Sequence, residues 1–330
     1  MTISPSTNDL SARPSTMTLI AHGGAGNWRP GSDEDAVEGM RIAVAEGRSV
    51  LRAGRSALDA VCATVVALED NPIFNAGTGA VLNFDGFCEL DASVMESRDR
   101  RFGAVCGLQR VRNPVLVARK VMEETDHVML TADGAQRFAR VMGFADHDPV
   151  TPERRADWLD KRNRVDEILG NRALKMRRFL KEHPEYAGGT VGAAAVDAEG
   201  VLAAATSTGG VTLKLVGRVG DSPVPGAGNY ASRWIAASAT GTGEYVLRTL
   251  ATRAISEAVE HGETLAGAMR AVLDDLGRAF DADVGIIAVD RHGKAIAAHR
   301  TRDMPHAFFE GDGEIVARMR AVVEERAGRI

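Results

Sequence analysis

Polar aromatic side chains and cysteine are scarce in this sequence. Its 330 residues include three tryptophans, three tyrosines and three cysteines, against 35 glycines. Cys62, Cys88 and Cys106 are odd in number and widely spaced, which argues against a disulfide framework or a zinc site and favours reduced, buried thiols. The many glycines predict tight turns and close approaches between backbone segments.

Long apolar runs and an excess of basic residues are also missing. The net charge of −5 disfavours a nucleic-acid partner, which would need a basic face. No run reaches the ~18 apolar residues of a membrane span. Residues 1–17 are rich in Ser, Thr and Pro and lack the apolar core of a signal peptide. We therefore expect a disordered tail over 1–17, a cytoplasmic protein, and no membrane partner.

Apolar periodicity predicts alternating strands and helices over the rest of the chain. The predicted strands cover residues 18–22, 87–95 and 102–108. The predicted helices cover residues 33–52, 56–69, 113–124, 131–141, 242–260 and 263–279. Ser56, followed by Asp59, resembles a capping box at the start of the second helix. Residues 71–80 are rich in turn formers and should form a loop.

Residues 145–188 are strongly charged and have few apolar anchors. Their basic residues include Arg154, Arg155, Lys161, Arg162, Arg177 and Arg178. The favoured interpretation is a solvated helix and linker that joins two halves of the chain, and a basic binding patch is the alternative.

Two segments of the second half have nearly the same shape. Residues 191–206 and 284–299 each contain Val-Gly, an apolar run, Val-Asp, two further residues and a glycine. This pattern predicts two hairpins whose antiparallel strands lie side by side in a core sheet. Because predicted helices lie between these hairpins, we expect sheets sandwiched between helix layers.

The sequence Gly188-Gly189-Thr190-Val191-Gly192 precedes the first hairpin. Taken alone, it is typical of a glycine turn that leads into a strand. The alternative is a cut between Gly189 and Thr190, which would leave Thr190 with a free α-amine beside its own hydroxyl. Such an amine has a pKa of roughly 7.7–8.0, so it can accept the hydroxyl proton near neutral pH without a histidine. Gly189 would allow the strained backbone that this cut requires.

The surrounding motifs favour the second interpretation. They are AHGGAG (21–26), NPIFNAGTGAVLN (71–83), ELDASVME (89–96), GTVGAAAVD (189–197), ATSTGG (205–210), GRVGDSP (217–223), GAGNYA (226–231) and ATGTGE (239–244). In this order they resemble the plant-type asparaginase and isoaspartyl peptidase family over residues 18–300, apart from the charged linker. The resemblance implies a four-layer αββα sandwich of the N-terminal-nucleophile hydrolase type, with two antiparallel sheets between helix layers.

The resemblance also implies one self-cleaving domain over 18–330. Its α chain would be 1–189, with a charged linker over about 145–189, and its β chain 190–330. Thr190 would be the nucleophile, and the Thr208 hydroxyl would contact it. Thr240 and Gly241 would stabilise the oxyanion. The simpler roles are a turn hydrogen bond for Thr208 and a helix N-cap for Thr240.

Arg218, Asp221 and Asn75 match the family's substrate-binding positions. A guanidinium and a carboxylate complement the α-carboxylate and α-ammonium that asparagine and β-aspartyl peptides share. The simpler alternative is a surface Arg-Asp pair of little energetic value. The Gly241 backbone would also contact substrate.

No cofactor is expected, but the loop at residues 68–76 resembles one that holds a structural sodium ion. The implied ligands are the backbone carbonyls of Leu68, Glu69, Asn71, Phe74 and Ala76. His22-Gly23-Gly24 resembles a lipase oxyanion segment, but the Gly-x-Ser-x-Gly elbow is missing from the sequence. We therefore interpret this segment as close-packed backbone near Thr190, and we assign Asp91 a structural role.

The predicted activity is hydrolysis of β-aspartyl dipeptides and L-asparagine to L-aspartate through a β-aspartyl-threonine intermediate. Residues 278–284 and 301–309 depart from the family pattern and favour the dipeptides over asparagine. The alternatives are a glycosylasparaginase of the same fold and an inactive relative that binds amino acids. The resemblance also implies a homodimer of αβ units.

Overall fold

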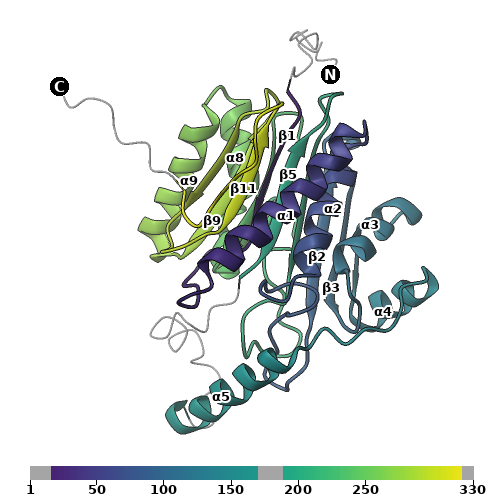
Figure 1. Cartoon of the computed structure of the whole chain (residues 1–330), viewed down its shortest axis with the longest axis vertical. Coiled ribbons are helices and arrows are strands. Elements are labelled where there is room, and N and C mark those ends of the chain that lie inside the picture. Colours follow the sequence, from purple (N-terminus) through teal and green to yellow (C-terminus); the bar gives the residue numbers. More distant parts are fainter. Residues whose placement is uncertain (1–15, 170–188, 322–330) are drawn as a thin grey trace, which may run out of the picture.

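The computed structural model describes residues 16–169 and 189–321, which form two β-sheets with helices on their outer faces (Figure 1). The larger sheet has eight strands in the order β12-β11-β1-β5-β6-β2-β3-β4. These are β1 Thr18–His22, β2 Leu90–Glu96, β3 Phe102–Leu108, β4 Met129–Thr131, β5 Val191–Val196, β6 Leu202–Thr208, β11 His306–Glu310 and β12 Val316–Arg318. The smaller sheet has the order β10-β9-β8-β7. Its strands are β7 Asn229–Ala231, β8 Ile235–Gly241, β9 Val284–Asp290 and β10 Ala295–His299.

The helices divide between the two sheets. Helices α1 (Asp33–Arg52), α2 (Ala57–Glu69), α3 (Pro114–Glu124) and α4 (Ala132–Val141) pack on the larger sheet, and α8 (Ala251–Glu260) and α9 (Leu265–Phe280) pack on the smaller one. The remaining helices are α5 (Pro152–Leu169), α7 (Gly243–Thr249) and the short η1 (Arg98–Arg100). The expected layering of sheets between helices is thus observed.

Most predicted helices begin and end within a residue or two of the predicted positions. The Ser56 side chain accepts a hydrogen bond from the Asp59 N–H, so it caps α2 as expected. The helix predicted over 242–260 is in fact two helices, because Leu250 adopts a left-handed conformation (φ 48°) between them. A branched side chain rarely adopts this conformation, so the sequence held no sign of the break.

The sheets depart from the prediction in two ways. One edge pair, β3 with β4, is parallel, whereas the other pairs among the described strands are antiparallel. In addition, the hairpins β5–β6 and β9–β10 lie in different sheets and not side by side in one. Strands β5, β6 and β9 are almost entirely buried, so their patterns do not reveal whether the hairpins pair edge to edge or pack face to face.

Small side chains fill the space between the two sheets. Ala194 and Ala204 of the larger sheet share a buried cluster with Ala236 and Ile287 of the smaller sheet. Short side chains bring the two sheets close together, so hydroxyl groups on one sheet reach partners on the other. This packing places β5, β6 and β8 around the predicted site.

The predicted linker is in part a helix. Helix α5 occupies residues 152–169, while Arg177 and Arg178 lie outside the described residues, as does most of the predicted N-terminal tail. Cys62, Cys88 and Cys106 are free and buried, as expected. Within 16–169 and 189–321, no helix is long and apolar enough to cross a membrane.

Candidate active site

Thr190 lies directly before β5, between the two sheets, and is only 6% exposed. Strand register pairs Val191 with Ser207, which brings Thr190 opposite Thr208 at the end of β6. The Thr190 hydroxyl donates to the Thr208 Oγ at 3.2 Å. The sheet itself therefore produces the predicted contact between these two hydroxyls.

The Gly189 carbonyl, which precedes Thr190, accepts two side-chain hydrogen bonds. Asn75 Nδ2 donates at 2.6 Å and the Thr208 hydroxyl at 3.3 Å. On the other side, Gly24 (φ 114°) approaches so closely that a methyl group on it would lie 2.8 Å from the Gly189 Cα. Two donors therefore hold the Gly189 carbonyl. The Gly24 backbone can approach it closely only because glycine has no side chain.

The Asn75 amide is fixed at both of its ends. Its Nδ2 also donates to the Gly210 carbonyl at 2.7 Å, and its Oδ1 accepts from the Val81 N–H at 2.8 Å. The Thr208 Oγ additionally accepts from the Gly210 N–H at 2.9 Å. The simpler turn role of Thr208 therefore coexists with its contact to Thr190.

Thr240 lies in β8 of the facing sheet, and its side chain is fully buried. Its Oγ accepts from the Thr190 N–H at 3.3 Å and from the Ala25 N–H at 3.1 Å. The helix N-cap interpretation of Thr240 was wrong, because the residue that precedes α7 is Thr242. The Thr240 hydroxyl therefore accepts a hydrogen bond from the N–H of the Gly189–Thr190 peptide bond.

A narrow pocket opens beside these groups. Its lining residues are Thr190, Thr208, Gly210, Val211, Arg218, Gly220, Asp221, Ser222 and Gly241. Gly241 has φ 115°, and a methyl group there would overlap the Asp283 carbonyl oxygen. The structure thus gathers the predicted catalytic and substrate-binding residues around one bond.

Arg218 and Asp221 do not form the simple surface pair considered above. Arg218 donates from Nε (3.0 Å) and Nη2 (2.9 Å) to Glu244 Oε1, a partner that the sequence interpretation missed. Asp221 is 3% exposed, and its Oδ2 has no hydrogen-bond partner within the described residues. Burial raises the pKa of Asp221 to about 7. An unsatisfied carboxylate here leaves room for a cationic ligand group.

Comparison with known proteins identifies relatives over most of the chain. The asparaginase family model matches residues 15–317. A plant-type L-asparaginase from Pyrococcus abyssi is 45% identical over 296 residues, which cover 89% of this chain and 96% of the relative. An isoaspartyl peptidase/L-asparaginase from Rattus norvegicus is 42% identical, covering 92% and 89%. An isoaspartyl peptidase from Escherichia coli K12 is 41% identical, covering 89% and 93%.

The chain belongs to the asparaginase family. The predictions of this family and of an enzyme are therefore confirmed. In each comparison the match covers most of this chain and most of the relative. The similarity therefore extends over whole chains and not over a shared fragment.

Near Thr190 lies a series of buried, hydrogen-bonded polar side chains that the sequence did not reveal. His22 Nε2 lies 2.9 Å from the Ser238 Oγ, which lies 2.8 Å from the Thr206 Oγ. Burial lowers the pKa of His22 to about 3, so the ring is neutral. These hydrogen bonds connect β1, β6 and β8 near Thr190. The available signals were the run of hydroxyl residues that ends β6 and the alternation of hydroxyl and alanine residues in β8.

The loop proposed to hold sodium has a suitable type of ligand. The carbonyls of Leu68, Glu69 and Asn71 accept backbone N–H groups, and that of Phe74 accepts from Arg154. Each carbonyl oxygen has two lone pairs, so these groups keep acceptor capacity. Hard cations take oxygen ligands of this kind.

Proposed function

We propose that this chain is a self-processing amidohydrolase with the αββα fold of N-terminal-nucleophile hydrolases. Cleavage between Gly189 and Thr190 would give an α chain of residues 1–189 and a β chain of residues 190–330. The observation that carries the proposal is the Gly189 carbonyl, which accepts from Asn75 and Thr208 while the Thr190 hydroxyl contacts Thr208.

In the first reaction, the Thr190 hydroxyl attacks the Gly189 carbonyl carbon. Asn75 and Thr208 stabilise the negative charge that develops on the carbonyl oxygen, as oxyanion donors do. As the bond from this carbon to the Thr190 nitrogen breaks, the proton of the attacking hydroxyl passes to that nitrogen, and an ester and a free α-amine result. Water hydrolyses the ester and releases Gly189 as a carboxylate.

In the second reaction, the α-amine of Thr190 accepts the proton of its own hydroxyl. The hydroxyl oxygen attacks the side-chain amide of the substrate, the amide C–N bond breaks, and the protonated α-amine returns the proton to the departing ammonia or amino acid. Water then hydrolyses the β-aspartyl ester and releases L-aspartate and the Thr190 hydroxyl. Thr240 and Gly241 stabilise the oxyanion of this step. Each such donor contributes roughly 3 kcal/mol.

The charged side chains that line the pocket complement a free aspartyl group. Arg218 binds the α-carboxylate, and Asp221 binds the α-ammonium. The names of the relatives, L-asparaginase and isoaspartyl peptidase, support substrates with this group. We place β-aspartyl dipeptides ahead of L-asparagine, because residues 278–284 and 301–309 depart from the family pattern.

Two further features of the family complete the proposal. A sodium ion would be held by the backbone carbonyls of residues 68–76 and would supply positive charge to that loop. Two αβ units would assemble into a homodimer.

An assay of L-aspartate release tests the substrate class. Mature protein should release aspartate from a β-aspartyl dipeptide with a higher kcat/KM than from L-asparagine, and both rates should exceed that for glycosylated asparagine. Correctly cleaved protein that binds aspartate but releases none from these substrates would contradict the proposal and favour an inactive binding relative.

A further inference from the structure

One arginine of α5 contacts the loop that carries Asn75. Arg154 Nε donates to the Gly79 carbonyl at 2.6 Å, and its Nη2 donates to the carbonyls of Ile73 (3.3 Å) and Phe74 (3.2 Å). A single guanidinium thus joins the two ends of the loop at residues 73–79.

The contacts of Arg154 flank Asn75 directly. Ile73 and Phe74 precede Asn75 in the chain, and Gly79 lies two residues before Val81, whose N–H donates to Asn75 Oδ1. Gly79 has φ 91°, and a methyl group on it would lie 2.5 Å from the Pro72 carbonyl oxygen. The loop is therefore tightly curved, and its curvature sets where the Asn75 amide points.

The charge of Arg154 is directed at carbonyl dipoles. Within residues 16–169 and 189–321, no carboxylate lies within ion-pairing distance of its guanidinium. The nearby Asp157 is instead paired with Arg29 at 3.2 Å and Lys161 at 2.8 Å. A planar guanidinium with a fixed fork of donors can serve three carbonyls at once, which a lysine ammonium does with poorer geometry.

We propose that Arg154 is a positioning residue for self-cleavage. It holds the loop at residues 73–79 in the curvature that places Asn75 Nδ2 on the Gly189 carbonyl. This inference rests on the proposed function. It assigns part of the charged segment before the cut to the maturation machinery and not to a solvated linker.

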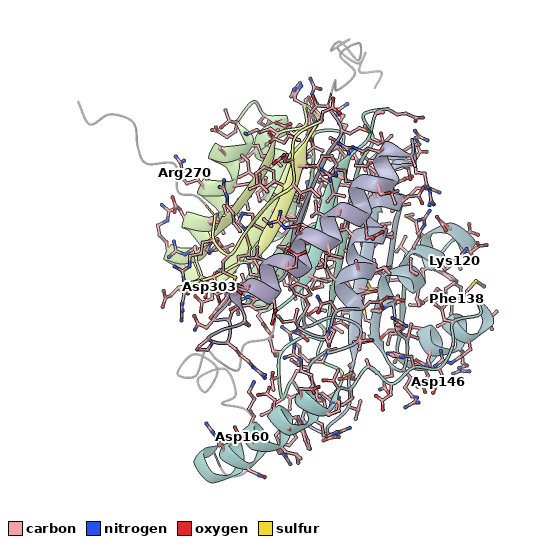
Figure 2. The ribbon with its side chains drawn as sticks, in the orientation of Figure 1. Lys120, Phe138, Asp146, Asp160, Arg270 and Asp303 are labelled. Atoms are coloured by element: carbon pink, nitrogen blue, oxygen red, sulfur yellow. The ribbon has the colours of Figure 1, made fainter. Side chains whose placement is uncertain are left out.

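The neighbouring residue offers a matched control. Arg155 donates to the Gly86 carbonyl at 2.7 Å and so also anchors α5, but it does not contact residues 73–79. Helix α5, which Asp160 marks in Figure 2, also contacts the body through Trp158, which donates to the Asn83 carbonyl, and through Asp157, which pairs with Arg29. Only the attachment through Arg154 leads to Asn75.

The test follows precursor cleavage after cell-free synthesis of the full chain, on denaturing gels and at a fixed sodium concentration. Arg154→Met should slow cleavage roughly 10- to 100-fold, because small misplacements of a catalytic group cost about this much. Arg154→Lys should be intermediate, and Arg155→Met should cleave at the parental rate. Millimolar guanidinium should partly restore Arg154→Ala.

A double-mutant comparison separates positioning from general stability. In the Asn75→Ala background, Arg154→Met should cause no further slowing. Cleavage of Arg154→Met and Arg154→Lys at the parental rate would overturn the inference, as would slowing that multiplies fully with that of Asn75→Ala. If the parent chain itself never cleaves, the proposed function fails instead.

Discussion

The hairpins β5–β6 and β9–β10 share a sequence shape but differ in what surrounds them. The residue before Val-Gly is Thr190 in the first hairpin and Asp283 in the second. Thr190 contacts Thr208 on the neighbouring strand and lies beside the substrate pocket. The second hairpin instead supports β8, with Gly285 paired to Thr240. The shared pattern therefore specifies a buried hairpin, and the chemistry depends on the residue that precedes it.

The loops after the two hairpins differ in the same way. Each contains a buried aspartate: Asp221 after β6 and Asp303 after β10. Asp303 accepts from Arg320 Nε at 2.8 Å, whereas Asp221 Oδ2 has no partner within the described part of the chain. One aspartate is satisfied by the protein, and the other keeps a carboxylate oxygen without a partner in that part of the chain.

The largest expected effect comes from the residue before each hairpin. Thr190→Ala should abolish both cleavage and aspartate release, because no other group supplies the attacking oxygen. It should remain one band near 35.1 kDa on a denaturing gel, while the parent gives two. Asp283→Ala should still cleave. If Thr190→Ala gave two bands and turned over substrate, the assignment of the nucleophile would be wrong.

The two aspartates provide the next comparison. Asp221→Asn should raise KM roughly 10- to 100-fold, the effect of losing one hydrogen bond to a charged group. Asp303→Asn should leave KM near the parental value but lower the free energy of unfolding by about 1–3 kcal/mol. An unchanged KM in Asp221→Asn would remove this residue from the substrate site.

The pH dependence of the same variants sharpens the comparison. Because the folded pKa of Asp221 is about 7, above its unfolded value of roughly 3.9, the proton favours the folded state. Its stabilising contribution is full below the unfolded pKa and is lost as pH rises through 7. Substrate ammonium needs the carboxylate, so KM should fall as pH rises through about 7. Asp303→Asn should keep this trend, and Asp221→Asn should lose it.

The glycines of the two Val-Gly pairs should differ by a smaller amount. A methyl group on Gly192 would overlap the Ser238 Oγ and lie 2.7 Å from His22 Nε2, within the series of buried polar side chains. A methyl group on Gly285 would instead contact the flexible end of the Met304 side chain. We expect Gly192→Ala to cost about 3 kcal/mol and Gly285→Ala about 1 kcal/mol. Denaturant unfolding measures both, and equal losses would contradict the role given to these polar side chains.

The turn aspartates should show the smallest difference. Asp197 and Asp290 each accept N–H groups two and four residues further on, within their own turns. Asp197 Oδ2 also accepts the Ala57 N–H at 2.9 Å, at the start of α2. Asp197→Ala should therefore cost about 1 kcal/mol more than Asp290→Ala, the value of one lost helix cap. Thermal unfolding of the two variants checks this difference.

The sequence predicted most of the elements because their patterns are local. Periodicity fixed α1 and β3, and a capping serine marked the start of α2. The sequence did not predict which sheet each hairpin joins, because strands buried on both faces lack a polar side that would show how they pack. Strand β8 was missed, since its run of small residues before Thr240 resembles loop material. Nothing in the composition around Leu250 indicates its left-handed conformation, which divides the predicted helix.

The structure brings the candidate site residues together and contains the expected Thr190–Thr208 contact, but the sequence did not predict their other partners. Motifs identified Thr190 and Asp221, yet only the fold showed that Glu244 holds Arg218 and that Arg154 reaches the Asn75 loop. Both contacts join residues far apart in sequence, and those of Arg154 are to backbone carbonyls, which leave no side-chain pattern. Charged residues such as these therefore need the structure before they can be assigned to solvent or to a site.

Intact mass spectrometry of the purified, active protein tests the central claim most directly. The account predicts two polypeptides, one of which begins with Thr190 and carries a free α-amine. Active protein in which the Gly189–Thr190 bond is whole, or in which the new terminus lies at another residue, would contradict it.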